Sequence, residues 1–397
     1  MAMNPDEPLT LLGGLTARAF LRDYWQQKPL LVRQAIPGFE SPLSPEELAG
    51  LACEEGVISR LVRERGETGS WALRTGPFDE DDFTTLPESH WTLLVSDMEK
   101  HLPELRAYLE PFRFIPDWRM DDLMVSYAAP EGSVGPHVDE YDVFLLQAQG
   151  RRRWQIARQA VSGDDFLPGV ELRILRDFQP DQEWILEPGD MLYLPPRIPH
   201  HGVAVGPCMT WSVGFRAPAW RDLMAAWVDQ RYEALAPQDR YADPGLEPQD
   251  NPGELSAAAL ARLIAGLRRA MAVDDAELAR WLGTVLTEPK AELLEHMQLP
   301  ETLTRDEALG LLQDGVSLER HGAARLAWMS DHGGLRLFVN GQEHLLPEAA
   351  GPLVRHLCAE TAYDGKALWG LASGIDSAED LLMSLCIAGI LLEIPAP

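Results

Sequence analysis

The sequence is poor in basic residues. It contains 34 Lys and Arg against 62 Asp and Glu, which gives a formal net charge of −28. Nucleic acid is therefore an unfavourable main partner, because a phosphate backbone is bound by a basic surface. The acidic excess is compatible with a basic protein partner, which it would attract over a distance, and equally with solubility alone.

Cysteines and long apolar runs are also scarce. The four cysteines (Cys53, Cys208, Cys358 and Cys386) share no paired spacing, so nothing in the sequence indicates a disulfide framework or a thiolate zinc site. The first residues, MAMNPDEPLTLL, lack the basic region and the apolar stretch of a signal peptide. No run reaches the roughly 18 apolar residues of a membrane span. We therefore expect a soluble, cytoplasmic protein with no membrane partner.

The length of 397 residues indicates more than one domain. We predict three parts, over residues 1–217, 218–297 and 298–397. Within the first part, residues 122–215 contain short β-rich runs such as VFLLQA and MLYLP, separated by Gly and Pro, which predict a sandwich or barrel. Helices and strands precede it, including a helix expected over residues 97–109.

The second and third parts differ from the first in their patterns. Apolar residues recur at spacings of three and four in WRDLMAAWVDQRYEAL and SAAALARLIAGLRRAMA, which predicts two amphipathic helices. Their apolar faces could pack on their own domain or meet a second copy in a homodimer. The third part follows the helix and strand order of a winged-helix fold. From Glu301 onward it has 14 acidic and 6 basic residues, so we expect no direct DNA binding.

Residues 135–154, GPHVDEYDVFLLQAQGRRRW, carry the first chemical signal. If the segment is a strand, His137 and Asp139 point to the same face, because side chains alternate along a strand. An imidazole and a carboxylate are two of the three ligands in a 2-His-1-carboxylate site for Fe(II). Such a short pattern also fits an ordinary surface His–Asp pair.

A third ligand could come from LPPRIPHHG, which contains His200 and His201. Adjacent strand residues face opposite sides, so only one of them can point at the other two ligands. We favour His200, because Gly202 and Ala204 on its face would leave room for a ligand. Valines would accompany His201 on the opposite face.

The three consecutive arginines suit the same chemistry. A metal site of this kind commonly binds 2-oxoglutarate, whose far carboxylate needs a cation that can donate two parallel hydrogen bonds. Gln149–Gly150 predicts a hairpin that returns Arg151–Arg153 beside the His137–Asp139 segment, with Arg152 pointing inward. Three solvated arginines, or a patch that binds RNA, are the alternatives.

Taken together, these motifs resemble a known family. IPDWRMDDLM, GPHVDEYDVFLLQAQGRRRW, LEPGDMLYLPPRIPHHG and SVGFRAP occur in this order in the bacterial ribosomal oxygenases, which are JmjC-type members of the cupin superfamily. The resemblance spans residues 1–220. It implies an α+β fold made of a double-stranded β-helix, a helical dimerisation region and a C-terminal winged-helix-like domain.

The resemblance also implies a set of site residues. The Fe(II) ligands fall on His137, Asp139 and His200, and the 2-oxoglutarate anchor falls on Arg152 with help from Ser126. O2 is the remaining reactant. A position that often carries Asn in the family is Thr210 here, so a role of Thr210 toward 2-oxoglutarate stays open.

By this resemblance, the chain is a 2-oxoglutarate-dependent dioxygenase that hydroxylates an arginine side chain of large-subunit ribosomal protein number sixteen. A basic ribosomal partner would match the acidic chain. Glu140, Tyr141 and Asp142 are candidates to contact the guanidinium. Two alternatives remain: a JmjC protein demethylase and a non-catalytic, metal-binding cupin with a regulatory role.

Overall fold

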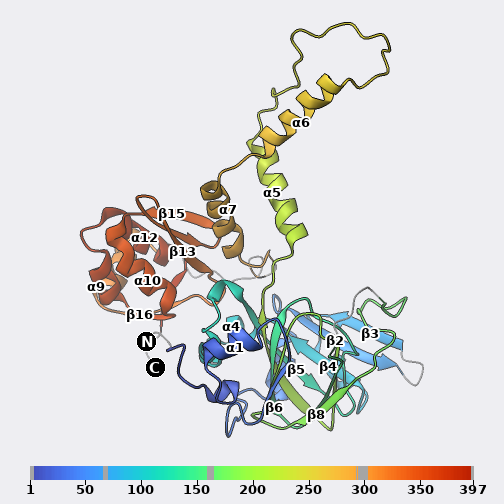
Figure 1. Cartoon of the computed structure of the whole chain (residues 1–397). Helices are drawn as coiled ribbons and strands as arrows, with labels where there is room; N and C mark the ends of the chain where they lie inside the picture. The colour runs from blue at the N-terminus through green and yellow to red at the C-terminus, as the bar shows by residue number, and fades with distance from the viewer. Residues whose placement is uncertain (1–3, 66–69, 159–164, 292, 294–302, 395–397) are drawn as a thin grey trace. The chain divides into compact units, whose positions relative to one another are not determined.

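The computed structural model describes residues 4–65, 70–158, 165–291, 293 and 303–394. Contacts divide the chain into two compact units, one made of Met1–Ala217 with Leu286–Pro397 and the other of Pro218–Val285. The first unit contains a β-barrel and a C-terminal part of helices and short sheets (Figure 1). The second unit is helical.

Two antiparallel sheets form the barrel. The larger has the strand order β1-β9-β6-β11-β5-β4-β2-β3, and the smaller has the order β10-β7-β8. The strands are β1 (Leu30–Val32), β2 (Ser59–Arg65), β3 (Ser70–Thr75), β4 (Trp91–Val95), β5 (Met120–Ala128), β6 (Asp142–Gln149), β7 (Arg152–Ile156), β8 (Gln182–Leu186), β9 (Met191–Leu194), β10 (His200–Ala204) and β11 (Cys208–Phe215). Apolar side chains of β6, β7, β8 and β9 share one buried cluster, which packs the two sheets face to face.

The runs of apolar residues become strands because both of their faces are covered. Almost all of β6 is buried, and so is all of β11. On β6, Val143 and Leu145 join the cluster between the sheets, whereas Phe144 and Leu146 join the core under the N-terminal helices. A short continuous apolar run is typical of such a strand.

The predicted hairpin at Gln149–Gly150 is wrong. β6 pairs with β9 and β11, whereas β7 pairs with β10 and β8 in the other sheet. Gly150 has a φ of 63°, and a Cβ there would lie 2.2 Å from the carbonyl oxygen of Pro207. The chain therefore crosses between the sheets through a close approach that only glycine permits. As a result, Arg152 on β7 lies opposite Ala204, which belongs to β10, the strand that begins with His200.

Short helices cover the outer side of the large sheet. They are α1 (Ala17–Asp23), α2 (Pro45–Leu51), α3 (Glu80–Thr84) and α4 (Met98–His101). The helix predicted over residues 97–109 is interrupted: α4 ends at His101, and a 3-10 helix, η2, spans Pro103–Tyr108. Pro103 has no backbone N–H and cannot continue the hydrogen bonds of an α-helix.

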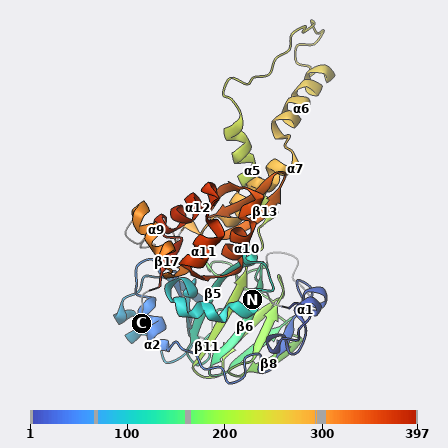
Figure 2. The same ribbon diagram turned by 90° about the vertical axis from the view of Figure 1, so that its left-hand side faces the viewer.

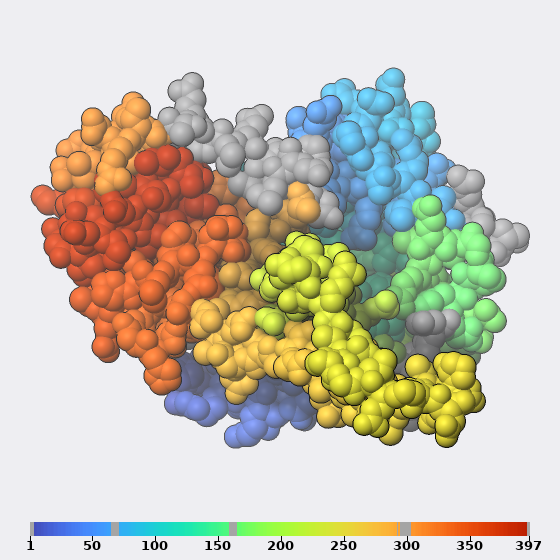
Figure 3. All heavy atoms as spheres, turned by 90° about the horizontal axis from the view of Figure 1, so that it is seen from above, coloured from blue at the N-terminus to red at the C-terminus, as the bar shows by residue number. Residues whose placement is uncertain are grey.

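The C-terminal part of the first unit is a winged helix. Its helices are α9 (Arg305–Gln313), α10 (Gly351–Ala359), α11 (Gly365–Ala372) and α12 (Asp376–Ile387). Its strands are β12 (Ser317–Arg320), β13 (Leu326–Asp331), β14 (Gly334–Val339), β15 (Gln342–Leu346), β16 (Ala362–Asp364) and β17 (Leu391–Glu393). β13, β14 and β15 form a meander, and β16-β12-β17 form a second small sheet. The helices gather around one apolar core (Figure 2), and the side chains form a continuous mass, orange to red in Figure 3.

The second unit consists of α5 (Trp220–Ala234), α6 (Ala257–Met271) and most of α7 (Asp275–Thr287). The rings of Trp227 and Trp281 lie 5.0 Å apart, and Arg231 forms an ion pair with Glu277 at 2.9 Å. The two predicted amphipathic helices are thus present. Part of the predicted second domain, residues 292 and 294–297, lies outside the described residues. Of the helices that the structure describes, none combines the length and the hydropathy needed to cross a bilayer.

Candidate metal and cosubstrate site

His137 and Asp139 lie in a loop before β6 rather than on the strand that we expected. An isolated bridge holds this loop. The backbone N–H of His137 donates to the carbonyl of His200 at 3.0 Å, and the N–H of His200 donates back to His137 at 3.0 Å. Further backbone hydrogen bonds hold the loop on either side, from Arg197 to the carbonyl of Asp139 at 2.7 Å and from Leu175 to the carbonyl of Pro136 at 2.8 Å. The loop thus keeps the side chains of His137 and Asp139 directed toward each other.

The side chains of His137, Asp139 and His200 converge from these two segments. The Nε2 of His137 lies 3.8 Å from Oδ1 of Asp139, and the Nε2 of His200 lies 3.5 Å from Oδ2. One ligand atom from each of the three residues lies within 4.8 Å of the other two. These distances suit three ligands around one divalent ion.

Hydrogen bonds orient both imidazoles for this role. The Nδ1 of His137 lies 2.9 Å from the carbonyl of Gly135, and the Nδ1 of His200 lies 2.9 Å from the carbonyl of Ile198. A carbonyl oxygen can only accept, so each Nδ1 carries the proton and each Nε2 keeps its lone pair for a metal. Burial, with His137 nearby, lowers the pKa of His200 to about 4, so its ring is neutral at neutral pH, as a ligand must be.

His200, and not His201, points at the other two residues. Its side chain is 3% exposed, whereas His201 is half-buried and its ring lies against Phe178. We expected Gly202, on the same face as His200, to leave room for a ligand, but in the structure it leaves room for Arg152. A Cβ at Gly202 would lie 2.6 Å from Nε of Arg152, so the missing side chain makes room for the arginine.

Arg152 is a buried cation with unused donors. Its side chain is 3% exposed, and Nη2 donates to the carbonyl of Gly202 at 3.2 Å. Its Nε and Nη1 have no hydrogen-bond partner among the described residues. Arg151 is exposed and Arg153 is half-buried, as the predicted alternation requires. An unpaired buried guanidinium is costly, so the arrangement calls for an anion.

The three converging residues and Arg152 line one cavity of about 420 Å³. Ser126 on β5 and Thr210 on β11 are cross-strand neighbours in its wall. The Ser126 hydroxyl donates to the Thr210 carbonyl at 3.3 Å, and the Thr210 hydroxyl donates to Oε1 of Gln147 at 3.3 Å. A small anion between Arg152 and the converging residues would meet these two hydroxyls as well.

The three candidates for contact with a substrate guanidinium have different environments. Tyr141 lines the cavity, whereas Glu140 is exposed and pairs with Arg197 at 2.8 and 3.1 Å. Asp142 is wrong as a candidate. Its carboxylate is fully buried and accepts hydrogen bonds from three side chains, those of Gln26, Tyr193 and Arg119. With its oxygens occupied, it anchors the start of β6.

Sequence reasoning missed several residues of the cavity wall. Trp154 follows Arg152 by two positions on β7, and its indole N–H is buried without a partner among the described residues. Strand alternation could have identified it. Asp121, Asp122 and Lys290 also line the cavity. No sequence pattern links Lys290 to residues so far from it along the chain.

Comparisons with known proteins agree with this geometry. A JmjC domain family model matches residues 107–223, and a ROXA-like winged-helix model matches residues 269–391. The ribosomal protein uL16 3-hydroxylase of Escherichia coli (strain K12) is 35% identical over 325 residues, which are 82% of this chain and 84% of that protein. A probable ribosomal oxygenase of Haemophilus influenzae is 34% identical over 343 residues, covering 83% of this chain and 82% of that protein.

Solved structures are similar over almost the whole chain. The ribosomal oxygenase YcfD from Escherichia coli has a TM-score of 0.80 at 32% identity, covering 96% of this chain and 98% of that one. Another YcfD structure, a complex with cobalt and 2-oxoglutarate, has a TM-score of 0.79 at 32% identity and covers 95% and 98%. The predicted combination of a double-stranded β-helix with a C-terminal winged helix is confirmed.

Proposed function

This chain belongs to the JmjC-type ribosomal oxygenases, which are Fe(II)- and 2-oxoglutarate-dependent hydroxylases, and we propose that it hydroxylates an arginine side chain of ribosomal protein uL16. uL16 is the large-subunit protein number sixteen of the family resemblance. A ribosomal protein substrate implies that the protein acts in the cytoplasm, where ribosomes are located. The arginine is the part of this proposal that the names of the relatives leave open.

His137, Asp139 and His200 would hold the iron. Two imidazole nitrogens and one carboxylate on one side of an ion leave other positions for a cosubstrate and O2, and this donor set is typical of non-haem Fe(II) oxygenases. The carbonyls of Gly135 and Ile198 would keep both Nε2 atoms aimed at the ion.

The observation that carries the proposal is the buried, unpaired guanidinium of Arg152 in the same cavity. A dicarboxylate bound at the metal by one end would place its other carboxylate against Nε and Nη1, which lack partners among the described residues. Ser126, and the Thr210 hydroxyl if it turns from Gln147, could donate to the same carboxylate. The preformed cation would keep the cosubstrate in one orientation.

Together, Fe(II), 2-oxoglutarate and O2 supply the chemistry: one oxygen atom enters a substrate C–H bond, and the other enters succinate as CO2 leaves. The protein itself holds the reactants in position and limits the access of water to them. Val143 and Leu145 of β6 and Trp154 of β7 make part of the cavity wall apolar, which limits water near the reacting carbon.

An acidic stretch of the cavity wall supports a cationic substrate side chain. Asp122, Met124 and Ser126 lie at alternate positions on β5, and all three line the cavity. Ser126 lies at the end of the cavity where 2-oxoglutarate would bind. Asp122 lies four residues before it on the same face of β5, because side chains on one face recur every two residues. With Tyr141, this arrangement offers a carboxylate and an aromatic ring to a guanidinium whose carbon chain extends toward the metal.

The test is to incubate the protein with recombinant uL16, Fe(II), 2-oxoglutarate and ascorbate, and then to sequence the product by mass spectrometry. We expect one added oxygen on one arginine and an equal yield of succinate. Loss of a methyl group would indicate a demethylase instead. Absence of succinate with every partner present would indicate a non-catalytic cupin. His200→Ala is the matched inactive control.

We also propose that the chain forms a homodimer through α5 and α6. Apolar side chains recur on both helices at helical spacing and are exposed: Trp220, Met224, Val228 and Tyr232 on α5, and Leu260, Leu263, Ile264, Leu267 and Met271 on α6. Trp220 is 83% exposed and Leu267 is 69% exposed, and none of the residues of α6 is buried. So large an apolar surface is typical of an interface with another chain.

The dimer proposal is tested by sedimentation at several concentrations. Leu267→Glu should shift the protein toward the monomer, because it would bury a charge in the interface. Leu345→Glu is the control, since Leu345 is also exposed (61%) but lies on β15. A monomeric wild type would contradict the proposal.

A further inference from the structure

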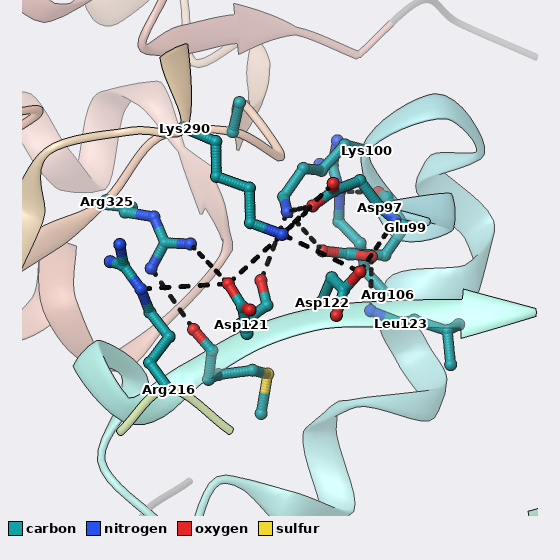
Figure 4. A network of polar contacts seen from close by, with 12 residues as sticks. Asp97, Glu99, Lys100, Arg106, Asp121, Asp122, Leu123, Arg216, Lys290 and Arg325 are labelled. Atoms are coloured by element: carbon teal, nitrogen blue, oxygen red, sulfur yellow. Dashed lines mark hydrogen bonds and ion pairs between the residues drawn. The ribbon is translucent and has the colours of Figure 1, made fainter. Parts of the chain in front are cut away.

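A cluster of buried and half-buried charged residues adjoins the cavity. It combines Asp97, Glu99 and Lys100 at helix α4 with Asp121 and Asp122 of strand β5 (Figure 4). Lys290, which follows the end of α7 by three residues, Arg216 and Arg325 complete it. The whole sequence has only four lysines, and two of them lie in this cluster. Of these residues, Asp121, Asp122 and Lys290 also line the cavity of the candidate site.

The ammonium group of Lys290 is shared among three carboxylates. Its Nζ lies 3.0 and 3.3 Å from the two oxygens of Asp97, 3.3 Å from Asp121 and 3.8 Å from Asp122. Asp97 is fully buried and binds Lys290 through both oxygens. Lys290 is therefore a fixed part of the wall, because its departure would leave a buried carboxylate with one fewer cation.

The three carboxylates differ in how many cations surround them. Asp97 also pairs with Lys100, and Asp121 also faces Arg325 at 3.5 Å and Arg216 at 3.9 Å. For Asp122, Lys290 is the only cation within ion-pair distance among the described residues. The ionisation of Asp122 therefore depends on Lys290 more than that of the other two does.

Asp122 is also the carboxylate that faces the space a substrate would use. Gly214 lies on β11, the strand next to that of Asp122 in the cavity wall. A Cβ at Gly214 would lie 3.2 Å from Oδ1 of Asp122, so the missing side chain leaves that oxygen uncovered on this side. The other oxygen accepts from the backbone N–H of Asp97 at 3.2 Å and faces Lys290. Oδ2 is thus held by the protein, while Oδ1 accepts no hydrogen bond from the residues that the structure describes and can accept one from a substrate.

Resting on the arginine hydroxylation proposed above, we propose that Lys290 is a positioning residue for the substrate. It keeps the carboxylate of Asp122 ionised and fixed in the cavity wall, ready to accept hydrogen bonds from an incoming guanidinium. It acts through Asp122 and touches neither the metal ligands nor Arg152 in any contact that the described residues show.

The surroundings of Asp122 support this role. Burial raises the pKa of Asp122, Lys290 lowers it, and the neighbouring Asp97, Glu99 and Asp121 raise it, so that together they bring it to about 6. The Tyr141 hydroxyl lies near enough for Asp122 to disfavour its ionisation, and Arg60 on β2 also lines the cavity. With a pKa of about 6, Asp122 is about nine-tenths ionised at pH 7.

The decisive experiment measures kcat and KM for recombinant uL16 from about pH 6 to about pH 9. Lys290→Met should raise KM about tenfold near pH 7, because more of Asp122 is then protonated, and the difference should shrink toward about pH 9. The value of kcat should stay within about twofold. Lys290→Arg should restore KM, and Lys366→Met, at an exposed lysine, should behave as wild type.

A double-mutant cycle separates this role from a general effect on folding. If Lys290 acts through Asp122, Lys290→Met should add little to the KM defect of Asp122→Asn. 2-Oxoglutarate affinity, measured by tryptophan fluorescence, should be unchanged in both variants. Should Lys290→Met fail to fold, Asp122→Asn still tests the idea, because it must abolish the rise in KM that the wild type shows as the pH falls through about 6.

The outcomes distinguish this inference from the function it rests on. A wild type that binds 2-oxoglutarate but leaves uL16 unmodified refutes the proposed function. A wild type that hydroxylates uL16, with a KM that is the same in Lys290→Met at every pH, refutes the role of Lys290 alone. A lower KM in Lys290→Met would also overturn it, because Lys290 would then be a competitor for the acidic wall.

Discussion

Replacing Arg152 with methionine should have opposite effects on cosubstrate binding and on stability. The guanidinium is 3% exposed, makes one hydrogen bond, to Gly202, and leaves Nε and Nη1 without partners among the described residues. In the absence of 2-oxoglutarate, it is a buried charge that costs stability. Once the dicarboxylate is bound, the same group forms charge-assisted hydrogen bonds.

The magnitudes follow from these two states. Losing a buried, hydrogen-bonded partner of a carboxylate costs about 2–5 kcal/mol, which is roughly thirtyfold to several thousandfold in the Kd for 2-oxoglutarate. Without cosubstrate, Arg152→Met should raise the free energy of unfolding by about 1–3 kcal/mol, because an apolar side chain replaces an unpaired cation. In the wild type, 2-oxoglutarate at a hundredfold excess over Kd should add about 2.7 kcal/mol of stability.

The assay is denaturant unfolding of the metal-loaded protein, with and without 2-oxoglutarate, together with a fluorescence titration of the cosubstrate. Arg151→Met is the matched control, because Arg151 is exposed and next in sequence. Two results would refute the reasoning. One is a Kd for 2-oxoglutarate that Arg152→Met leaves unchanged. The other is a cosubstrate-free variant several kcal/mol less stable than the wild type, which would mean that Arg152 serves the fold.

Three further predictions concern the strand that begins at His200. His200→Ala should abolish Fe(II) binding in a metal titration, whereas His201→Ala, which removes a half-buried ring directed away from the site, should largely preserve it; the reverse result would exchange their roles. Gly202→Ala should weaken 2-oxoglutarate binding by at least about tenfold, with metal binding retained, because the added Cβ would lie 2.6 Å from Nε of Arg152 and 2.8 Å from the Trp154 ring; an unchanged affinity would show that the arginine can shift freely. In chelator, the metal-free protein should lose stability as the pH falls from about 6.5 to about 4. Burial lowers the pKa of His200 from 6.5 to about 4, so the unfolded chain binds the extra proton in that window, worth roughly 3 kcal/mol. His200→Gln should make this dependence shallower in urea unfolding at each pH, with part of it retained because the pKa of His201 is also lowered to about 4. A curve as steep as that of the wild type would contradict the prediction.

The sequence could predict the parts of the site that are close together along the chain. The two-residue spacing of His137 and Asp139 survives in a loop, because bridging to His200 holds the backbone extended there. The alternation Arg151, Arg152, Arg153 gives one buried and two more accessible side chains, as a strand requires. The same rule shows that only one of His200 and His201 can face the site, and the small residues Gly202 and Ala204 on the face of His200 favoured His200.

Other features needed the tertiary structure. A hairpin after Gln149 was a reasonable prediction from Gln-Gly, but β7 joins the second sheet, because β10 and β8 satisfy the backbone hydrogen bonds along both of its edges. The face of β7 that carries Arg152, Trp154 and Ile156 is buried, whereas Arg153 and Gln155 on the other face are half-buried. Asp142 resembled a surface acid from its position beside the motif. Gln26, Tyr193 and Arg119 reach it from three distant segments and make it structural.

The chain by itself thus determined the chemistry: which side chains could bind a metal and a dicarboxylate, and which face of a strand they occupy, because alternation is a local property of the backbone. Which other residues lie beside those side chains was decided only by the tertiary structure. The crossing at Gly150 brings Arg152 beside the His200 strand. The segment after α7 carries Lys290 back to Asp122, across 168 residues of sequence. Such long-range contacts depend on how separate segments pack to bury apolar surface and to pair charges. A local sequence pattern contains no information about that packing.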